Sequence, residues 1–217
     1  MHTYYEVNFS DTIDISSSVC FHTIGFNWIT RGRTHSVVTI PKNCSTTLKD
    51  IAPELNWSKH YDAANANANE YIVILRDPVK RWVSGAAEYL IRLLLRDRPR
   101  QTEIGDIFKQ PLFRKMLSDN AQFDMHTTPQ AVFLQGLPLE RTKFFYMDNN
   151  DPVADVLNYM GTPATAPVQN TAEDTDIKRE LTLHLKEMMT NIPMRKRIEK
   201  QTWCDKILLE TVNFENY

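Results

Sequence analysis

Short apolar runs alternate with segments of helical spacing along the first half of the chain. Residues 36–40 (SVVTI) form a β-branched run that ends at Pro41, and residues 71–75 (YIVIL) form a second run. Runs of this length and composition are typical of buried strands. Each is followed by a segment with helical spacing, residues 45–51 after the first run and residues 79–95 after the second. The repeated order of strand, loop and helix predicts a parallel sheet with helices on its faces.

The second half of the chain continues this alternation. Residues 143–147 (KFFYM) predict a third strand, and residues 152–160 predict a helix that ends at Gly161. We therefore expect one α/β domain over residues 1–217, P-loop-like, with a central parallel sheet flanked by helices. The other expected segments are helices around residues 104–117 and 129–134, a long loop over residues 162–176, and helices over residues 177–189 and 194–209.

The composition is typical of a soluble globular protein. Apolar residues make up 42% and charged residues 24% of the chain, and no stretch approaches the ~20 apolar residues of a membrane span. The formal net charge of −2 gives no reason to expect nucleic-acid binding, although basic residues gather in residues 92–100 and 195–200. Because the N-terminus lacks the pattern of a signal peptide, we expect a cytoplasmic protein with no membrane segment.

The three cysteines indicate neither a disulfide framework nor a zinc site. Cys20, Cys44 and Cys204 show no CxxC spacing and no neighbouring pattern of metal ligands. A reducing compartment fits this arrangement best, and we expect no metal at the functional site.

The loop after the first predicted strand carries donors suited to an anion. In residues 40–48 (IPKNCSTTL), the backbone N–H groups and the start of the following helix predict a nest for phosphate or sulfate. Lys42 adds a positive charge, and Ser45, Thr46 and Thr47 add hydroxyl donors. The loop lacks the GxxxxGK[ST] pattern, which argues against an ordinary ATPase or GTPase. A helix N-terminus capped by Ser or Thr explains the same residues equally well.

A second motif begins where the second predicted strand ends, at Arg76 of RDPVKRWVSG. Open α/β sheets bind ligands at the carboxyl ends of their strands. Ser84 lies two helical turns further on, so both side chains can reach one phosphate if the helix packs back over the strand end. The alternative is that Arg76 and Asp77 form a structural ion pair, with Arg81 on a solvated helix face.

In combination, the order PKxxSTxL followed by RDPxxRxxS resembles the cofactor signature of the family of sulfotransferases that use 3′-phosphoadenosine 5′-phosphosulfate (PAPS). Residues 123–130 (FDMHTTPQ) resemble the DxHxxPQ pattern of its carbohydrate-type members. Residues 143–148 with the helix after them, and residues 167–170 (PVQN), are similar to later segments of the family. The resemblance extends over most of the chain.

The resemblance implies that PAPS is the cofactor. Cys44 stands where many members have Gly or Ala, and its position beside a helix N-terminus predicts a lowered thiol pKa and an oxidisable thiol. We expect Lys42 to stabilise charge on the departing phosphate as well as to bind it. The implied contacts to the phosphosulfate come from Lys42, Asn43, Cys44, Ser45, Thr46 and Thr47, and those to the 3′-phosphate from Arg76 and Ser84.

Sulfuryl transfer also needs a general base for the acceptor proton. His60 lies between the first helix and the second strand, where several branches of the family carry a catalytic histidine. His126 lies in the FDMHTTPQ segment and is the rival. Glu88, one turn beyond Ser84, is a third candidate because some branches use a carboxylate.

These observations predict a sulfotransferase that transfers a sulfuryl group to a hydroxyl or amine of a small-molecule or carbohydrate acceptor. A P-loop-type nucleotide phosphotransferase is one alternative, but it would need Mg²⁺ ligands and a Walker A lysine before Ser or Thr. A non-catalytic anion- or nucleotide-binding module that kept the pocket and lost its base is the other. It would bind the adenosine 3′,5′-bisphosphate product without catalysing transfer.

Overall fold

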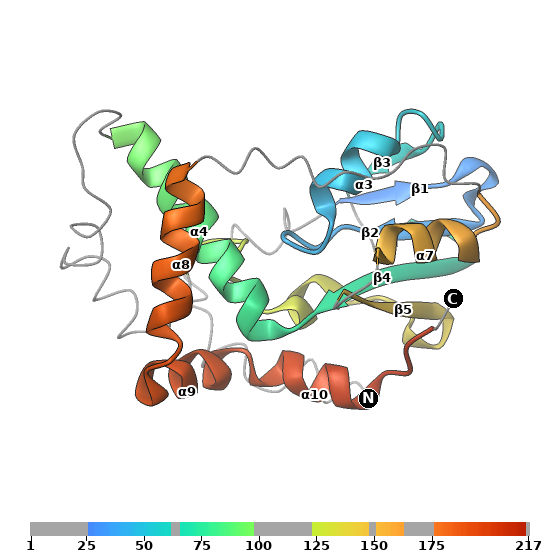
Figure 1. The fold of residues 1–217 in the computed structure, drawn as a ribbon. Coiled ribbons are helices and arrows are strands. Elements are labelled where there is room, and N and C mark those ends of the chain that lie inside the picture. Colours follow the sequence, from blue (N-terminus) through green and yellow to red (C-terminus); the bar gives the residue numbers. More distant parts are fainter. Residues whose placement is uncertain (1–25, 62–65, 98–122, 148–150, 163–175, 216–217) are drawn as a thin grey trace.

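The computed structural model describes residues 26–61, 66–97, 123–147, 151–162 and 176–215 (Figure 1). In this part of the chain a five-stranded sheet has the order β3-β1-β2-β4-β5. The strands are β1 (Asn27–Ile29), β2 (His35–Val38), β3 (Ser58–His60), β4 (Glu70–Arg76) and β5 (Thr142–Met147).

The sheet is parallel at its centre and mixed overall. β2, β4 and β5 are parallel, with Val38 opposite Val73 and Arg76 opposite Met147. The prediction of parallel strands is therefore confirmed for these three. β1 pairs antiparallel with both β2 and β3, which corrects the expectation of a purely parallel sheet. Each of the two unpredicted strands has only three residues, too few for an alternating pattern to stand out.

Helices follow the strands much as expected. The helices predicted at residues 45–51, 79–95, 152–160 and 177–189 are confirmed, whereas the one expected at residues 194–209 divides at Thr202, whose φ of −99° and ψ of 17° interrupt the helix. Residues 130–134 form a 3₁₀ helix, and the helix expected around residues 104–117 lies outside the described residues. The bounds are α3 (Ser45–Ile51), α4 (Pro78–Asp97), η3 (Gln130–Leu134), α7 (Pro152–Tyr159), α8 (Asp176–Met188), α9 (Ile192–Gln201) and α10 (Trp203–Thr211).

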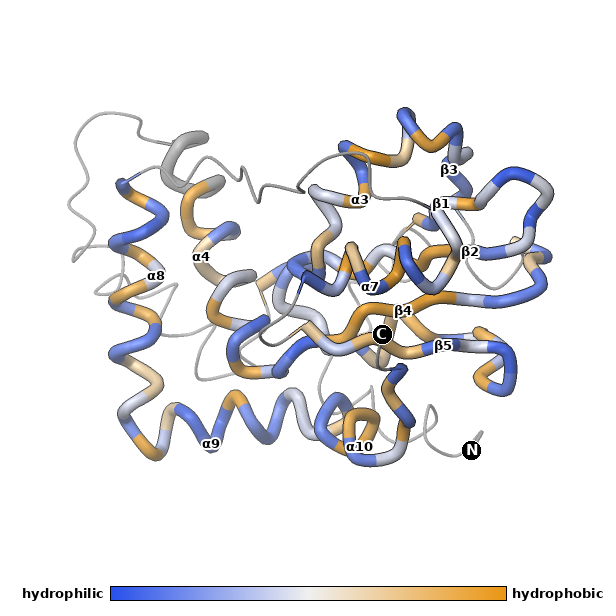
Figure 2. Tube along the Cα trace, turned by 45° about the vertical axis from the view of Figure 1, so that its right-hand side comes forward, coloured by the Kyte–Doolittle hydropathy of each residue, from blue (hydrophilic) through white to orange (hydrophobic). Residues whose placement is uncertain are grey.

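Strand β4 lies between two apolar layers. Tyr71, Val73 and Leu75 pack on one face with residues of η3 and α10, whereas Ile72 and Ile74 pack on the other with residues of α3 and α7. The strand accordingly forms an almost continuous hydrophobic stretch in Figure 2, as strands buried on both faces do. The two layers make the body an α/β sandwich. The P-loop-like architecture remains a prediction.

A third apolar cluster joins helices α4, α8 and α9 beside the sheet (Figure 1). Because α4 starts at the end of β4 and runs away from it, this cluster carries α8 to the carboxyl edge of the parallel strands. Within the described residues, no helix is long and apolar enough to cross a bilayer. The main buried side chains of the cluster are Trp82, Val83, Ala86, Ala87, Leu90, Leu181, Leu185 and Ile198.

Candidate functional site

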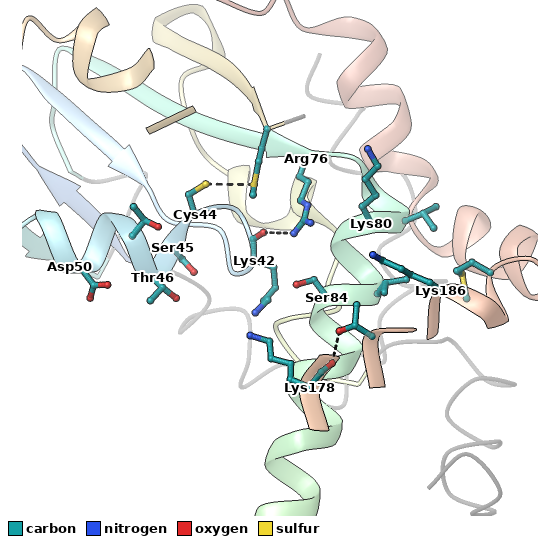
Figure 3. Close-up of a pocket in the computed structure, with 16 residues that line it drawn as sticks. Lys42, Cys44, Ser45, Thr46, Asp50, Arg76, Lys80, Ser84, Lys178 and Lys186 are labelled. Atoms are coloured by element: carbon teal, nitrogen blue, oxygen red, sulfur yellow. Dashed lines mark hydrogen bonds between the residues drawn. The ribbon is translucent and has the colours of Figure 1, made fainter. Parts of the chain in front are cut away.

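A cavity of about 590 Å³ lies where the carboxyl ends of β2 and β4 meet α3, α4 and α8 (Figure 3). The structure brings most of the predicted cofactor residues together there, although they come from two motifs separated by more than 25 positions. Asp50 is the one acidic residue among the described residues of its lining. The predicted residues that line the cavity are Lys42, Cys44, Ser45, Thr46, Thr47, Arg76 and Ser84.

The backbone of the loop has the alternating conformation of an anion nest. φ is +70° at Lys42 and +58° at Cys44, and it is not positive at Asn43 between them. Alternation of this kind turns backbone N–H groups toward one side, where they can bind an anion, although the N–H of Asn43 donates to Ile40. Positive φ in a residue other than glycine costs about 1–3 kcal/mol, so the surrounding structure must hold this loop in place.

Asn43 is one of the residues that hold the loop. Its side chain is only 1% exposed and does not line the cavity. Nδ2 donates to the carbonyl oxygen of Ile74 at 2.8 Å and to Oε1 of Gln130 at 2.6 Å, and the backbone N–H donates to Ile40 at 3.1 Å. The Asn43 side chain thus fastens the loop to β4, and the cofactor contact predicted for this residue stays a prediction.

Gln130 fixes the end of β4 in the same network. Its Nε2 donates to the carbonyl oxygen of Arg76 at 2.8 Å, and its Oε1 accepts from the backbone N–H of Arg76 at 2.9 Å. The side-chain amide therefore pairs with the strand end as a neighbouring strand would. The FDMHTTPQ motif contributes to the site through this glutamine, a role that the sequence pattern did not indicate.

Arg76 joins the two motifs directly. Its Nη1 donates to the carbonyl oxygen of Lys42 at 3.1 Å, while the residue lines the cavity. The Asp77 carboxylate accepts from the backbone N–H of Lys80 at 2.7 Å and so caps the start of α4. The predicted position of Arg76 at a strand end is confirmed.

Arg81 is buried, so its expected place on a solvated face is wrong. The side chain is 1% exposed, and its guanidinium donates to the carbonyl oxygens of Pro41, Thr128 and Met125. Burial lowers the pKa of Arg81 to about 10, and the nearby Asp205 charge counters that shift. The cation ties residues 41–44, the predicted anion loop, to the turn around residue 126.

Two of the three candidate bases lie away from the cavity. His60 ends β3 opposite Asn27, which itself pairs with Val38, so two strand spacings place it about 10 Å from β2. His126 is buried, and its Nδ1 lies 2.7 Å from Oδ2 of Asp124. Neither histidine lines the cavity.

Glu88 is the candidate base that the structure brings to the site. Its Oε2 lies 3.5 Å from Nζ of Lys42. Burial lowers the pKa of Lys42, as do the charges of Lys178 and Arg76, while Glu88 raises it. Glu88, one helical turn beyond Ser84, does not itself line the cavity and reaches the site through this pair with Lys42.

The prediction of a reactive Cys44 thiol is wrong. Burial, with a contribution from Asp151, raises the pKa of Cys44 to about 12. Its Sγ donates to Sδ of Met147 at 3.6 Å. Desolvation of the thiol outweighs the helix N-terminus, so Cys44 acts as a small apolar residue in the floor of the cavity. Cys44 and Cys204 are both free thiols.

Three lysines in the lining escaped the sequence analysis. Lys80 belongs to α4, and Lys178 and Lys186 belong to α8. The available signal for the two lysines of α8 was their helical spacing, since Lys178, Thr182 and Lys186 recur every four residues, whereas Lys80 lies within the RDPVKRWVSG motif itself. The basic run in residues 195–200 instead lies on α9, where Arg195 pairs with Glu199 at 2.8 Å.

Comparison with family models, with curated proteins and with solved structures gives no match to this chain. Across the described ranges, no group of three or more His, Cys, Asp or Glu side chains is placed to hold a metal ion.

Proposed function

We propose that this chain is a sulfotransferase that transfers a sulfuryl group from PAPS to a hydroxyl or amine of a small-molecule or carbohydrate acceptor. One observation carries the proposal. The loop with alternating φ at Lys42 and Cys44, the strand-end Arg76 and Ser84 of α4 all line one basic cavity. These are the two elements that the sequence resemblance assigns to the two anionic ends of the cofactor.

The residues present fit such a cofactor. The cavity volume lies within the range of about 300–1,000 Å³ that is typical of small-molecule sites. Hydroxyl groups of Ser45, Thr46 and Thr47 line one side, and Arg76 offers a guanidinium on another. Guanidinium and hydroxyl donors are well suited to phosphate and sulfate oxygens.

Catalysis would use Lys42 and Glu88. When bound, PAPS supplies a sulfuryl group, whose sulfur gains a bond to the acceptor oxygen or nitrogen and loses its bond to the 5′-phosphate. Lys42 holds positive charge at the loop and stabilises the negative charge that develops on the leaving phosphate. Glu88, 3.5 Å from that ammonium, accepts the proton that the acceptor loses.

Thermal unfolding with competing ligands tests the proposal. Adenosine 3′,5′-bisphosphate should raise the melting temperature, and at 100 times its dissociation constant the stabilisation should be about 2.7 kcal/mol. ATP with Mg²⁺ is the matched control and should give a smaller shift. A larger shift with ATP and Mg²⁺ would favour the phosphotransferase alternative, and no shift with millimolar bisphosphate would contradict the proposal.

A non-catalytic binding module is the second candidate, and one observation favours it. None of the three candidate bases, His60, His126 and Glu88, lines the cavity, and Glu88 reaches it only through Lys42. Such a module would bind the bisphosphate with the same affinity. It would not release adenosine 3′,5′-bisphosphate from PAPS in the presence of acceptors or water, whereas the proposed enzyme would.

A further inference from the structure

Helix α8 carries an apolar stripe and a basic stripe side by side. Leu181 and Leu185 are fully buried against α4, four residues apart. Lys178, Thr182 and Lys186 are spaced in the same way and line the cavity. The alternation is visible along α8 in Figure 2. Packing of the leucines on α4 therefore aims the lysines at the cavity, because both stripes follow the helical repeat.

The lysine nearest the anion loop faces another lysine. In Figure 3 the side chains of Lys178 and Lys42 extend toward each other from opposite walls. Their charges interact, since Lys178 contributes to the lowered pKa of Lys42. Lys186 extends from α8 into the same cavity. Like charges brought together in this way favour an anion between them.

The positive charge of the cavity lining matches the negative charge of the proposed cofactor. Among the described residues, the cavity is lined by the cations Lys42, Arg76, Lys80, Lys178 and Lys186 and by the carboxylate of Asp50. PAPS carries about four negative charges near neutral pH, because a phosphate monoester approaches a charge of −2. Without the lysines of α8, the three other cations and Asp50 leave a formal charge of only +2. Lys178 and Lys186 raise it to +4.

We infer that α8 forms a second anion-binding wall of the cavity, in which Lys178 and Lys186 bind phosphate or sulfate oxygens of the cofactor opposite the anion loop. This inference rests on the proposed function and adds to it a third element, which neither sequence motif contains. The cofactor then bridges α8 and the loop. The same chemistry could instead serve an anionic acceptor, and the experiment separates the two sources.

Calorimetric titration with adenosine 3′,5′-bisphosphate tests whether Lys178 and Lys186 bind the ligand. Lys178→Gln and Lys186→Gln should each weaken binding about 10- to 100-fold, as the loss of a charge-assisted hydrogen bond does. Lys178→Arg should retain most of the affinity. Arg179→Gln is the matched control, because Arg179 belongs to the same helix and does not line the cavity, and it should bind within about twofold of the wild type.

The outcomes separate this inference from the function on which it rests. If the wild type binds the bisphosphate and both lysine variants bind it as well as Arg179→Gln does, the α8 wall is wrong and the proposed function stands. If those variants instead raise only the Michaelis constant of an anionic acceptor, the lysines serve the acceptor and the inference is overturned. If the wild type does not bind the bisphosphate, both proposals fail together. Circular dichroism melts of each variant verify that an affinity loss does not come from unfolding.

Discussion

The anion loop is held by buried hydrogen bonds, whereas the lysines of α8 are held by apolar packing. Asn43, Gln130 and Arg81 fasten residues 41–44 to β4 and to the turn around residue 126. Lys178 and Lys186 depend on leucines that pack against α4. Hydrogen bonds restrict the positions of the bonded atoms more tightly than apolar contacts do, because they depend on both distance and angle. In the proposed enzyme, the anion loop would be a preorganised wall of the cavity, and α8 would be a more adaptable wall opposite it.

Glu88 lies on α4 beside Lys42 of the anion loop, and its replacement should have the largest effect. Glu88→Gln keeps the shape of the side chain but cannot accept the acceptor proton, so we expect turnover to fall by about 10²- to 10⁴-fold with bisphosphate affinity nearly unchanged. Glu210→Gln is the control, because Glu210 also pairs with a lysine, Lys206 at 3.8 Å, but far along α10. The rate of product formation from PAPS gives the turnover of both variants. Undiminished turnover in Glu88→Gln would return the role to His60 or His126, whose alanine variants would be next.

The partial burial of Cys44 predicts that its thiol reacts slowly with alkylating reagents. Because burial raises the pKa of Cys44 from 9.0 to about 12, the thiol stays neutral at pH values where an unfolded thiol ionises. At pH 8 its thiolate should be about 1000-fold rarer than that of an ordinary cysteine. Iodoacetamide labelling followed by mass spectrometry should modify Cys44 slowly in the native protein and quickly in urea, with the rate rising only toward pH 12. Rapid native labelling at pH 8 would contradict the account of a buried floor.

The free energy of unfolding of an Arg81 variant tests how far the anion loop depends on this buried cation. Arg81→Met leaves three carbonyl oxygens and the buried Asp205 without their cation, and such a change costs about 3–5 kcal/mol of unfolding free energy. Arg195→Met is the matched control on exposed α9 and should change stability by less than about 0.5 kcal/mol. Urea denaturation gives both values. A small effect in Arg81→Met would mean that the loop does not depend on this anchor.

The local parts of this site were predictable from the sequence, and its long-range parts were not. The loop after β2 and Arg76 at the end of β4 follow from residues close together in the chain. Gln130 bonds to the end of β4 from 54 positions away in the sequence, and the lysines of α8 line the cavity from still further along the chain. Hydrophobic periodicity reports local structure and gives no signal for contacts between such distant residues. The burial of Arg81 was missed because it stands beside Lys80 in an amphipathic helix, where an arginine is ordinarily solvated.

An Arg76 variant separates a role of this side chain in ligand binding from a role in stabilising the fold. Arg76→Ala should weaken bisphosphate binding by about 1.5–3 kcal/mol, roughly ten- to a hundredfold, with a smaller loss of stability. Arg141→Ala is a suitable control, since Arg141 also donates to a backbone carbonyl, that of Ala68 at 3.2 Å, without lining the cavity. Titration and urea denaturation are compared for both. Normal binding with early unfolding would make Arg76 a structural residue.

The central claim is that two separate elements of this cavity bind the two ends of one cofactor. Phosphorus NMR of adenosine 3′,5′-bisphosphate tests it directly, because the two phosphates give separate resonances. We predict that both resonances shift on binding to the wild type, that Lys42→Met reduces mainly the shift of the 5′-phosphate, and that Arg76→Ala reduces mainly that of the 3′-phosphate. Resonances that do not move with the wild-type protein, or two variants that affect the same phosphate, would contradict the claim.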